Sequence, residues 1–163
     1  MLKWQVTGLA LTMLVLTGCS SLPKSVQLAS NQQNIAYQKA FLPTALKHTV
    51  LWQGQIAQIT NTDQKTRLQI VYQQLDYQGN VVNDNSAGRF VAIIPQFLDP
   101  MIYRPGRSIS VKGVIDRPMG ISVGQSHQKV PVIEVKQFYL WPIVKDKPPE
   151  HPFRVFASDC FYP

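Results

Sequence analysis

The sequence predicts an all-β domain, a small five-stranded OB-like barrel, with a small β-sandwich as the alternative. Five strand-like runs lie between positions 49 and 141, and the loops that join them are unequal in length. One run contains an internal glycine, Gly54, of the kind that marks a bulge or sharp bend in a small barrel. A helical turn is expected between the third and fourth runs. Closure into a barrel would remove most exposed strand edges.

Local patterns set the strand boundaries. Strands are expected over residues 49–60, 66–75, 89–94, 107–116 and 130–141. In the second run, Leu68, Ile70 and Tyr72 alternate with polar residues, as in a half-buried strand. The third run is almost entirely apolar, which indicates a central strand.

Turn and loop residues separate these runs. Asn, Thr, Asp and Gln at positions 61–64 predict a turn that joins the first two strands into a hairpin. A polar loop is expected over residues 76–88. A short helical turn followed by a tight turn is expected over residues 96–106, and a glycine-containing loop over residues 117–129.

The first eighteen residues have the parts of a secretory signal. Lys3 gives a positive amino-terminal region, and the apolar stretch over residues 8–16 is too short to cross a hydrocarbon core, which needs roughly 20 residues. Small residues then lead directly to Cys19. The alternative is a plain signal peptide or a membrane stub with an incidental cysteine.

The four residues Leu-Thr-Gly-Cys at positions 16–19 resemble the lipobox of bacterial lipoproteins. This resemblance implies a diacylglyceryl group on the thiol of Cys19, cleavage before that residue and acylation of the new amine. Two or three acyl chains hold a protein at a membrane far more firmly than one. By resemblance to the sorting rule of enterobacterial lipoproteins, Ser20 implies transfer to the outer membrane.

These features divide the chain into four parts. Residues 1–18 form the signal peptide, 19–46 the lipidated cysteine and tether, 47–142 the barrel, and 143–163 an irregular tail rich in proline and aromatic residues. The tether is expected to be flexible as far as residue 34. Its later apolar residues are expected to dock on the barrel, with a helical turn as one form: Ile35, Tyr37, Phe41 and Leu42.

The chain is basic, with 16 Lys and Arg against 9 Asp and Glu, a net charge of +7 that becomes +6 without Lys3. Anionic lipid headgroups, cell-wall polymers and acidic protein patches are suitable partners. Nucleic acid is not expected for an exported protein, and a role of the charge in solubility alone is an equal alternative. Once Cys19 carries lipid, Cys160 is left either as an inert thiol or for an intermolecular disulfide.

No cluster of residues predicts catalysis, a metal site or a cofactor. His48, His127 and His151 lack the spacing of zinc ligands. Asp99, beside a proline, is expected to stabilise a turn or to pair with a nearby arginine rather than to catalyse. Glu134 is expected to form a salt bridge across strands with Lys112 or Arg89.

Three segments of the chain resemble one known family. They are residues 52–56 (Trp-Gln-Gly-Gln-Ile), residues 88–90 followed by 97–100 and Tyr103, and residues 130–135 continuing to 140–141. Together with the lipobox they resemble the Slp family, starvation-inducible outer-membrane lipoproteins of gammaproteobacteria. The resemblance covers residues 49–142, and the tail after Pro142 departs from the family pattern. It implies lipid on Cys19, the outer membrane and induction under stress, but no biochemical activity.

The prediction is therefore a lipid-anchored, non-catalytic protein that binds an envelope component at the periplasmic face of the outer membrane. A cell-wall or glycan-binding module is the alternative, and an enzyme using Asp99 or Glu134 is a third hypothesis. By analogy with other OB-like barrels, the candidate binding face consists of Arg67, Tyr72, Arg89 and Lys112. Trp52 and Trp141 are expected in the core or at the barrel rim.

Overall fold

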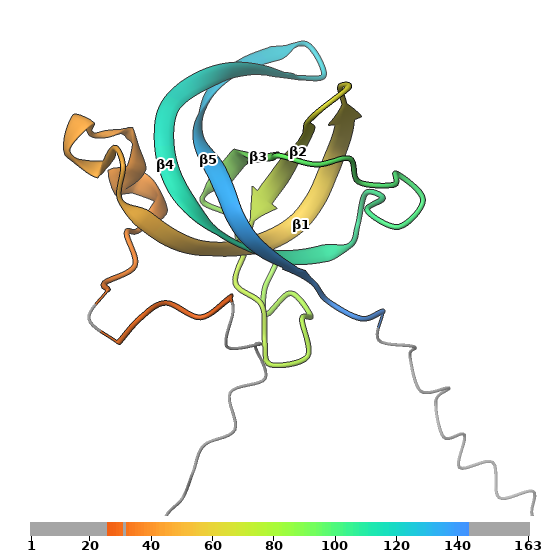
Figure 1. The fold of residues 1–163 in the computed structure, drawn as a ribbon, viewed down its shortest axis with the longest axis horizontal. Coiled ribbons are helices and arrows are strands. Elements are labelled where there is room, and N and C mark those ends of the chain that lie inside the picture. Colours follow the sequence, from red (N-terminus) through yellow and green to blue (C-terminus); the bar gives the residue numbers. More distant parts are fainter. Residues whose placement is uncertain (1–25, 31, 144–163) are drawn as a thin grey trace, which may run out of the picture.

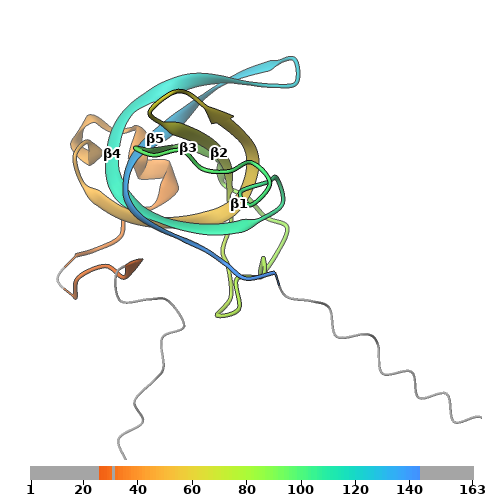
Figure 2. The same ribbon diagram turned by 45° about the vertical axis from the view of Figure 1, so that its right-hand side comes forward.

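The structure is a computed structural model that describes residues 26–30 and 32–143. Its body is a closed barrel whose five strands follow the order β1-β2-β3-β5-β4 around the ring (Figures 1 and 2). Their bounds are β1 (Thr49–Asn61), β2 (Thr66–Tyr72), β3 (Gly88–Ile94), β4 (Ser108–Val123) and β5 (Ser126–Leu140). Neighbouring strands are antiparallel except β3 and β5, which are parallel. The predicted five-stranded OB-like barrel is confirmed.

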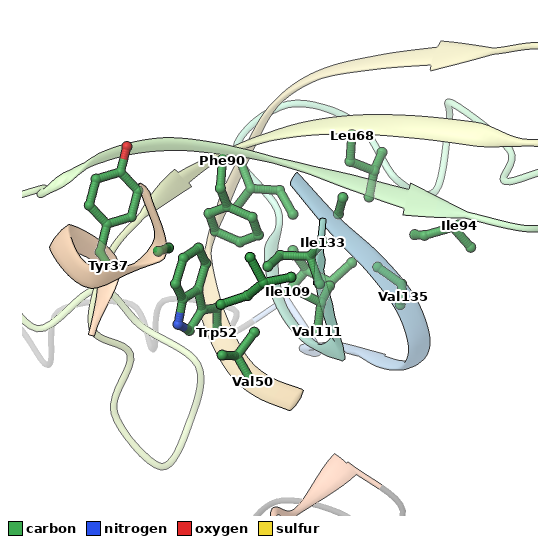
Figure 3. Close-up of a cluster of buried hydrophobic side chains, with 14 of the residues drawn as sticks. Tyr37, Val50, Trp52, Leu68, Phe90, Ile94, Ile109, Val111, Ile133 and Val135 are labelled. Atoms are coloured by element: carbon green, nitrogen blue, oxygen red, sulfur yellow. The ribbon is translucent and has the colours of Figure 1, made fainter. Parts of the chain in front are cut away.

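The interior of the barrel is filled by one face of each strand, as the alternation of apolar residues predicts. Trp52 of β1 and Phe90 of β3 are the two largest fully buried side chains, and their ring centroids lie 5.3 Å apart. Aliphatic side chains extend the same buried cluster from this pair (Figure 3): Val50, Leu68, Ile94, Ile109, Val111, Ile133 and Val135. Among the described residues, the interior of the barrel is therefore mostly apolar.

Gly54 is where β1 changes partner. Residues 49–55 of β1 pair with β4, and residues 54–61 pair with β2, so the strand turns a corner between the two. A side chain at Gly54 would overlap the carbonyl oxygen of Val71 on β2. The predicted bend at this glycine is confirmed, and its cause is the close approach of two backbones.

The predicted loop over residues 117–129 is wrong, because this stretch forms a long hairpin. β4 continues to Val123 and β5 begins at Ser126. Pro118 is tolerated because it lies in a register shift between Asp116 and Met119, where its missing N–H breaks no ladder hydrogen bond. Gly124, with φ +59°, opens the two-residue turn that joins the strands.

The segment before β1 closes the interior at one side. It contains two short 3-10 helices, η2 (Tyr37–Phe41) and η3 (Pro43–Ala45). Tyr37 is buried against Trp52, with ring centroids 5.6 Å apart, and its hydroxyl donates to the carbonyl of Arg89 at 2.8 Å. The expected docking is confirmed for Ile35 and Tyr37. It is wrong for Phe41 and Leu42, which are 40% and 52% exposed.

The expected flexible tether also proves shorter than residues 20–34. The side-chain amide of Asn34 donates to the Leu51 carbonyl at 2.7 Å and accepts from the Leu51 N–H at 3.1 Å. It thereby supplies hydrogen-bond partners to the backbone of Leu51, at an edge of β1 where no residue of β2 pairs. Val26 is only 2% exposed. No helix among the described residues has the length and hydropathy needed to span a membrane.

Candidate binding surfaces

The four residues of the predicted binding face do not form one surface. Tyr72 points into the barrel, where its ring lies 5.2 Å from that of Tyr37 and 5.3 Å from that of Trp52. Arg67 and Arg89 lie on the opposite, outward side of β2 and β3. Lys112 belongs to β4, which pairs with β1 and β5 and not with β2 or β3. The prediction of one basic and aromatic face is therefore corrected.

Lys112 is moreover engaged within the chain. Its Nζ donates to the carbonyl of Gln27 at 2.7 Å, which fixes the amino-terminal segment against the outside of β4. The expected salt bridge of Glu134 with Lys112 or Arg89 is not formed. Among residues 26–30 and 32–143 the ion pair present is Lys47–Asp116, at 3.7 Å, and Glu134 lies exposed on β5.

The outer face of β3, where OB-folds commonly bind ligands, is covered by the chain itself. The β4–β5 hairpin brings Ile121 and Val130 against Val91 of β3, and all three are at most 7% exposed. This second apolar cluster, which also contains Val132, is separate from the barrel interior. The outer surface of β3 around Val91 is thus occupied by side chains of the hairpin.

An exposed apolar loop, residues 95–107, joins β3 to β4. We call its three exposed side chains the apolar loop patch: Phe97 (63% exposed), Met101 (82%) and Ile102 (52%). Large contiguous apolar patches mark interaction sites, whereas scattered single apolar side chains are normal. These three side chains share one short loop. The predicted binding face did not include these residues, although three large apolar side chains in a predicted turn can be recognised in the sequence.

The loop that carries this patch is held in place by hydrogen bonds and by buried neighbours. Asp99 accepts from the Met101 N–H through its carboxylate at 2.8 Å, and through its carbonyl from Ile102 and Tyr103. These contacts form the expected helical turn and confirm the turn-stabilising role of Asp99. Leu98 is 3% exposed and its N–H donates to the hydroxyl of Thr66 at 2.9 Å. The patch is therefore presented by a fixed loop.

The remaining candidates for chemistry are dispersed. No three His, Cys, Asp or Glu side chains of the described residues come together as metal ligands would. His127 contacts Ser122 across the β4–β5 hairpin, with Nδ1 and Oγ 3.1 Å apart, and His48 lies directly before β1. His151, Cys19 and Cys160 lie outside the described residues, as do the predicted signal peptide and most of the tail.

Both tryptophans named above are buried, as expected. Trp52 is 1% exposed in the interior, and Trp141 is 4% exposed on the outside of β4. The indole N–H of Trp141 donates to the hydroxyl of Ser110 at 3.0 Å, and its ring covers the backbone of Gly79. Trp141 therefore joins the end of β5 to the loop that follows β2.

Comparison with known proteins identifies a family and a distant structural likeness. The family model described as "Outer membrane lipoprotein Slp family" matches residues 16–162. No curated protein sequence matches the chain. A crystal structure of the small single-stranded DNA-binding protein from Streptomyces coelicolor is similar over 58% of this chain and 94% of that chain, with 9% identity and a TM-score of 0.40. A likeness of this degree carries no argument about ligands.

The matched range extends the expected resemblance at both ends. It begins at Leu16 and so includes the four residues of the lipobox. It runs to residue 162, so the expectation that the tail after Pro142 departs from the family pattern is wrong.

Proposed function

Because this chain belongs to the Slp family of outer membrane lipoproteins, we propose that it is a non-catalytic protein that binds another component of the cell envelope. Its lipid is carried by Cys19, its barrel lies at the periplasmic face of the outer membrane, and its role belongs to starvation or stationary phase. The bound component is a protein.

The observation that carries this proposal is the apolar loop patch. Phe97, Met101 and Ile102 are all more than half exposed, on a loop whose backbone is already fixed by Asp99. A partner that covers them gains apolar burial and loses little loop entropy, because the loop is ordered beforehand. A long, flexible apolar side chain such as Met101 adapts well to a protein surface.

A non-catalytic role is supported by the structural use of the acidic side chains. The carboxylates of Asp76 and Asp99 accept backbone hydrogen bonds in turns, and Asp116 pairs with Lys47. A general acid or base needs a free carboxyl beside a substrate pocket. Glu134, the other carboxylate considered for catalysis, lies exposed on a strand.

The proposal is tested by photo-crosslinking in intact cells. A benzophenone amino acid replaces Met101 in one strain and Gln125, at the tip of the β4–β5 hairpin, in a control strain. We expect a discrete adduct with an envelope protein from position 101, stronger in starved than in growing cells. Equal crosslinking from the two positions would contradict binding through the patch.

A cell-wall polymer is the second candidate partner, supported by the basic balance of the chain. Purified sacculi distinguish the two. Retention of the unlipidated protein at low salt, lost when salt screens the charges, would favour the polymer. No retention at low salt removes this candidate.

A further inference from the structure

The folded body begins close to the residue proposed to carry lipid. Val26 is 2% exposed, and the carbonyl of the next residue, Gln27, accepts the hydrogen bond from Lys112 on β4. Val26 is seven positions after Cys19. Seven residues of fully extended chain span at most about 25 Å.

This reach is shorter than the body itself. A domain of about 100 residues has a radius of gyration of about 13 Å and is therefore roughly 35 Å across. If acyl chains at Cys19 lie in the bilayer, the end of the barrel that carries Val26 must be turned toward the membrane. The opposite end, where the β4–β5 hairpin turns, is held away from it.

The loop between β2 and β3 projects at the same end. Figures 1 and 2, which differ by a rotation about the vertical axis, both place residues 73–87 below the barrel, together with residues 26–30 and 141–143. This loop carries Tyr77, which is 72% exposed, and Val82, which is 55% exposed. Ile143, 58% exposed, follows Trp141 at the end of the described chain.

The tip of this loop is a small ordered hairpin. Leu75 and Val81 form a β-bridge, and the carboxylate of Asp76 accepts from the N–H groups of Gln78 and Asn80 at 2.8 and 2.9 Å. Gly79 packs directly beneath the ring of Trp141. Tyr77 is therefore presented outward from a fixed base.

We propose that this end of the barrel rests on the lipid bilayer, with Tyr77 and Val82 seated in the headgroup layer. The inference depends on the proposed lipid at Cys19. A tyrosine suits the interface because its ring prefers an apolar environment while its hydroxyl stays hydrated. Two such side chains bind weakly alone, but the anchor supplies the proximity that makes a weak contact persistent.

The charges of this loop indicate which lipid it meets. Asp76 and Asp84 are its ionisable acidic groups, and it has no lysine or arginine. Anionic headgroups would repel it, whereas a zwitterionic headgroup such as phosphatidylethanolamine would not. The contact therefore depends on apolar burial and short reach instead of the basic charge of the chain.

The test uses the full-length lipidated protein, reconstituted in vesicles of phosphatidylethanolamine with a minor share of phosphatidylglycerol. Cys160→Ser removes the other thiol. A nitroxide is then attached in Tyr77→Cys, in Val82→Cys and, as the matched control, in Gln125→Cys at the hairpin tip. Power saturation compares collisions of each label with oxygen, which partitions into lipid, and with a water-soluble nickel chelate.

We expect labels at positions 77 and 82 to gain oxygen collisions and lose nickel collisions on reconstitution, while position 125 stays water-like. Water-like labels at 77 and 82 on protein whose Cys19 carries lipid by mass spectrometry would overturn the membrane contact and leave the proposed function intact. An unmodified Cys19 would overturn both. Unchanged tryptophan emission verifies that each variant is folded.

Discussion

Tyr37 tests whether the segment before β1 is part of the cooperative fold. Its ring is buried against Trp52 and Tyr72, and its hydroxyl bonds to the Arg89 carbonyl. Truncation of a buried aromatic side chain to alanine costs about 3–5 kcal/mol, whereas loss of one hydrogen bond costs about 0.5–1.5 kcal/mol. We therefore expect Tyr37→Ala to lower the free energy of unfolding by about 4 kcal/mol, and Tyr37→Phe to lower it by about 1 kcal/mol.

The assay is urea unfolding of the unlipidated mature chain, made with Cys19→Ser. Trp52 and Trp141 are both buried, so their fluorescence shifts to longer wavelength as the protein unfolds. With a slope of about 2 kcal/mol per molar urea, Tyr37→Ala lowers the midpoint by about 2 M. Leu42→Ala, in the same segment but 52% exposed, is the control and should change stability by less than about 0.5 kcal/mol.

If Tyr37→Ala were no more destabilising than Leu42→Ala, the segment over residues 34–46 would not belong to the cooperative unit. Since Tyr37 also covers Gly88, where a side chain would strike its hydroxyl, the reciprocal variant Gly88→Ala should be destabilising as well. Gly88 also has φ +137°, which is unfavourable for alanine, so backbone strain adds to this overlap.

Three further predictions concern single contacts and pH. Trp141→Phe removes the hydrogen bond to Ser110 and should lower the free energy of unfolding by about 1 kcal/mol. Adding Ser110→Ala to this variant should cause no further loss, as a double-mutant cycle in urea would measure. Burial raises the pKa of Tyr37 and Tyr72 above the value of an unfolded tyrosine. The free energy of unfolding should therefore be unchanged below pH 10 and fall above it, because tyrosine ionises more readily in the unfolded chain. Tyr72→Phe should reduce this fall, as measured by urea unfolding at alkaline pH. Slight desolvation raises the pKa of the Asp76 carboxyl, but hydrogen bonds from the loop outweigh it and hold the pKa below its ordinary value. The loop should therefore stay ordered at neutral pH and lose order as the pH falls through this lowered pKa. Amide hydrogen exchange would detect the change, and Asp76→Asn should abolish its dependence on pH.

The strands in which apolar and polar residues alternate could be predicted from the sequence, because this alternation alone indicates which side chains face the interior. In β2, Leu68 and Ile70 face the interior and Arg67 faces outward, as period-two alternation requires. The same alternation places Tyr72 inside. Grouping Tyr72 with Arg67 as one binding face therefore contradicted the pattern that had located the strand.

The long β4–β5 hairpin was missed because the glycines of residues 117–129 were interpreted as loop residues. Pro118 suggests a loop unless a register shift removes the need for its N–H. Gly124 followed by Gln125, between Val123 and Ser126, is a two-residue hairpin turn with glycine first. That signal was present in the sequence.

Other features depended on contacts that no local pattern contains. The amide of Asn34 completes the edge of β1 across 17 positions, and a polar, amide-rich segment otherwise resembles a linker. The fixed base under the apolar loop patch likewise depends on the bond from Leu98 to Thr66, which are 32 positions apart. The patch residues could have been noticed, but their exposure could not have been predicted.

The ring order has a consequence for when this protein can fold during secretion. β5 alone connects β3 to β4, so the ring cannot close before residues 132–134, which pair with β3, are available. Distant pairings of this kind delay folding until most of the polypeptide is free. The barrel is therefore expected to cross the inner membrane as an open chain and to assemble afterwards, while its amino-terminal end is already held at a lipid surface.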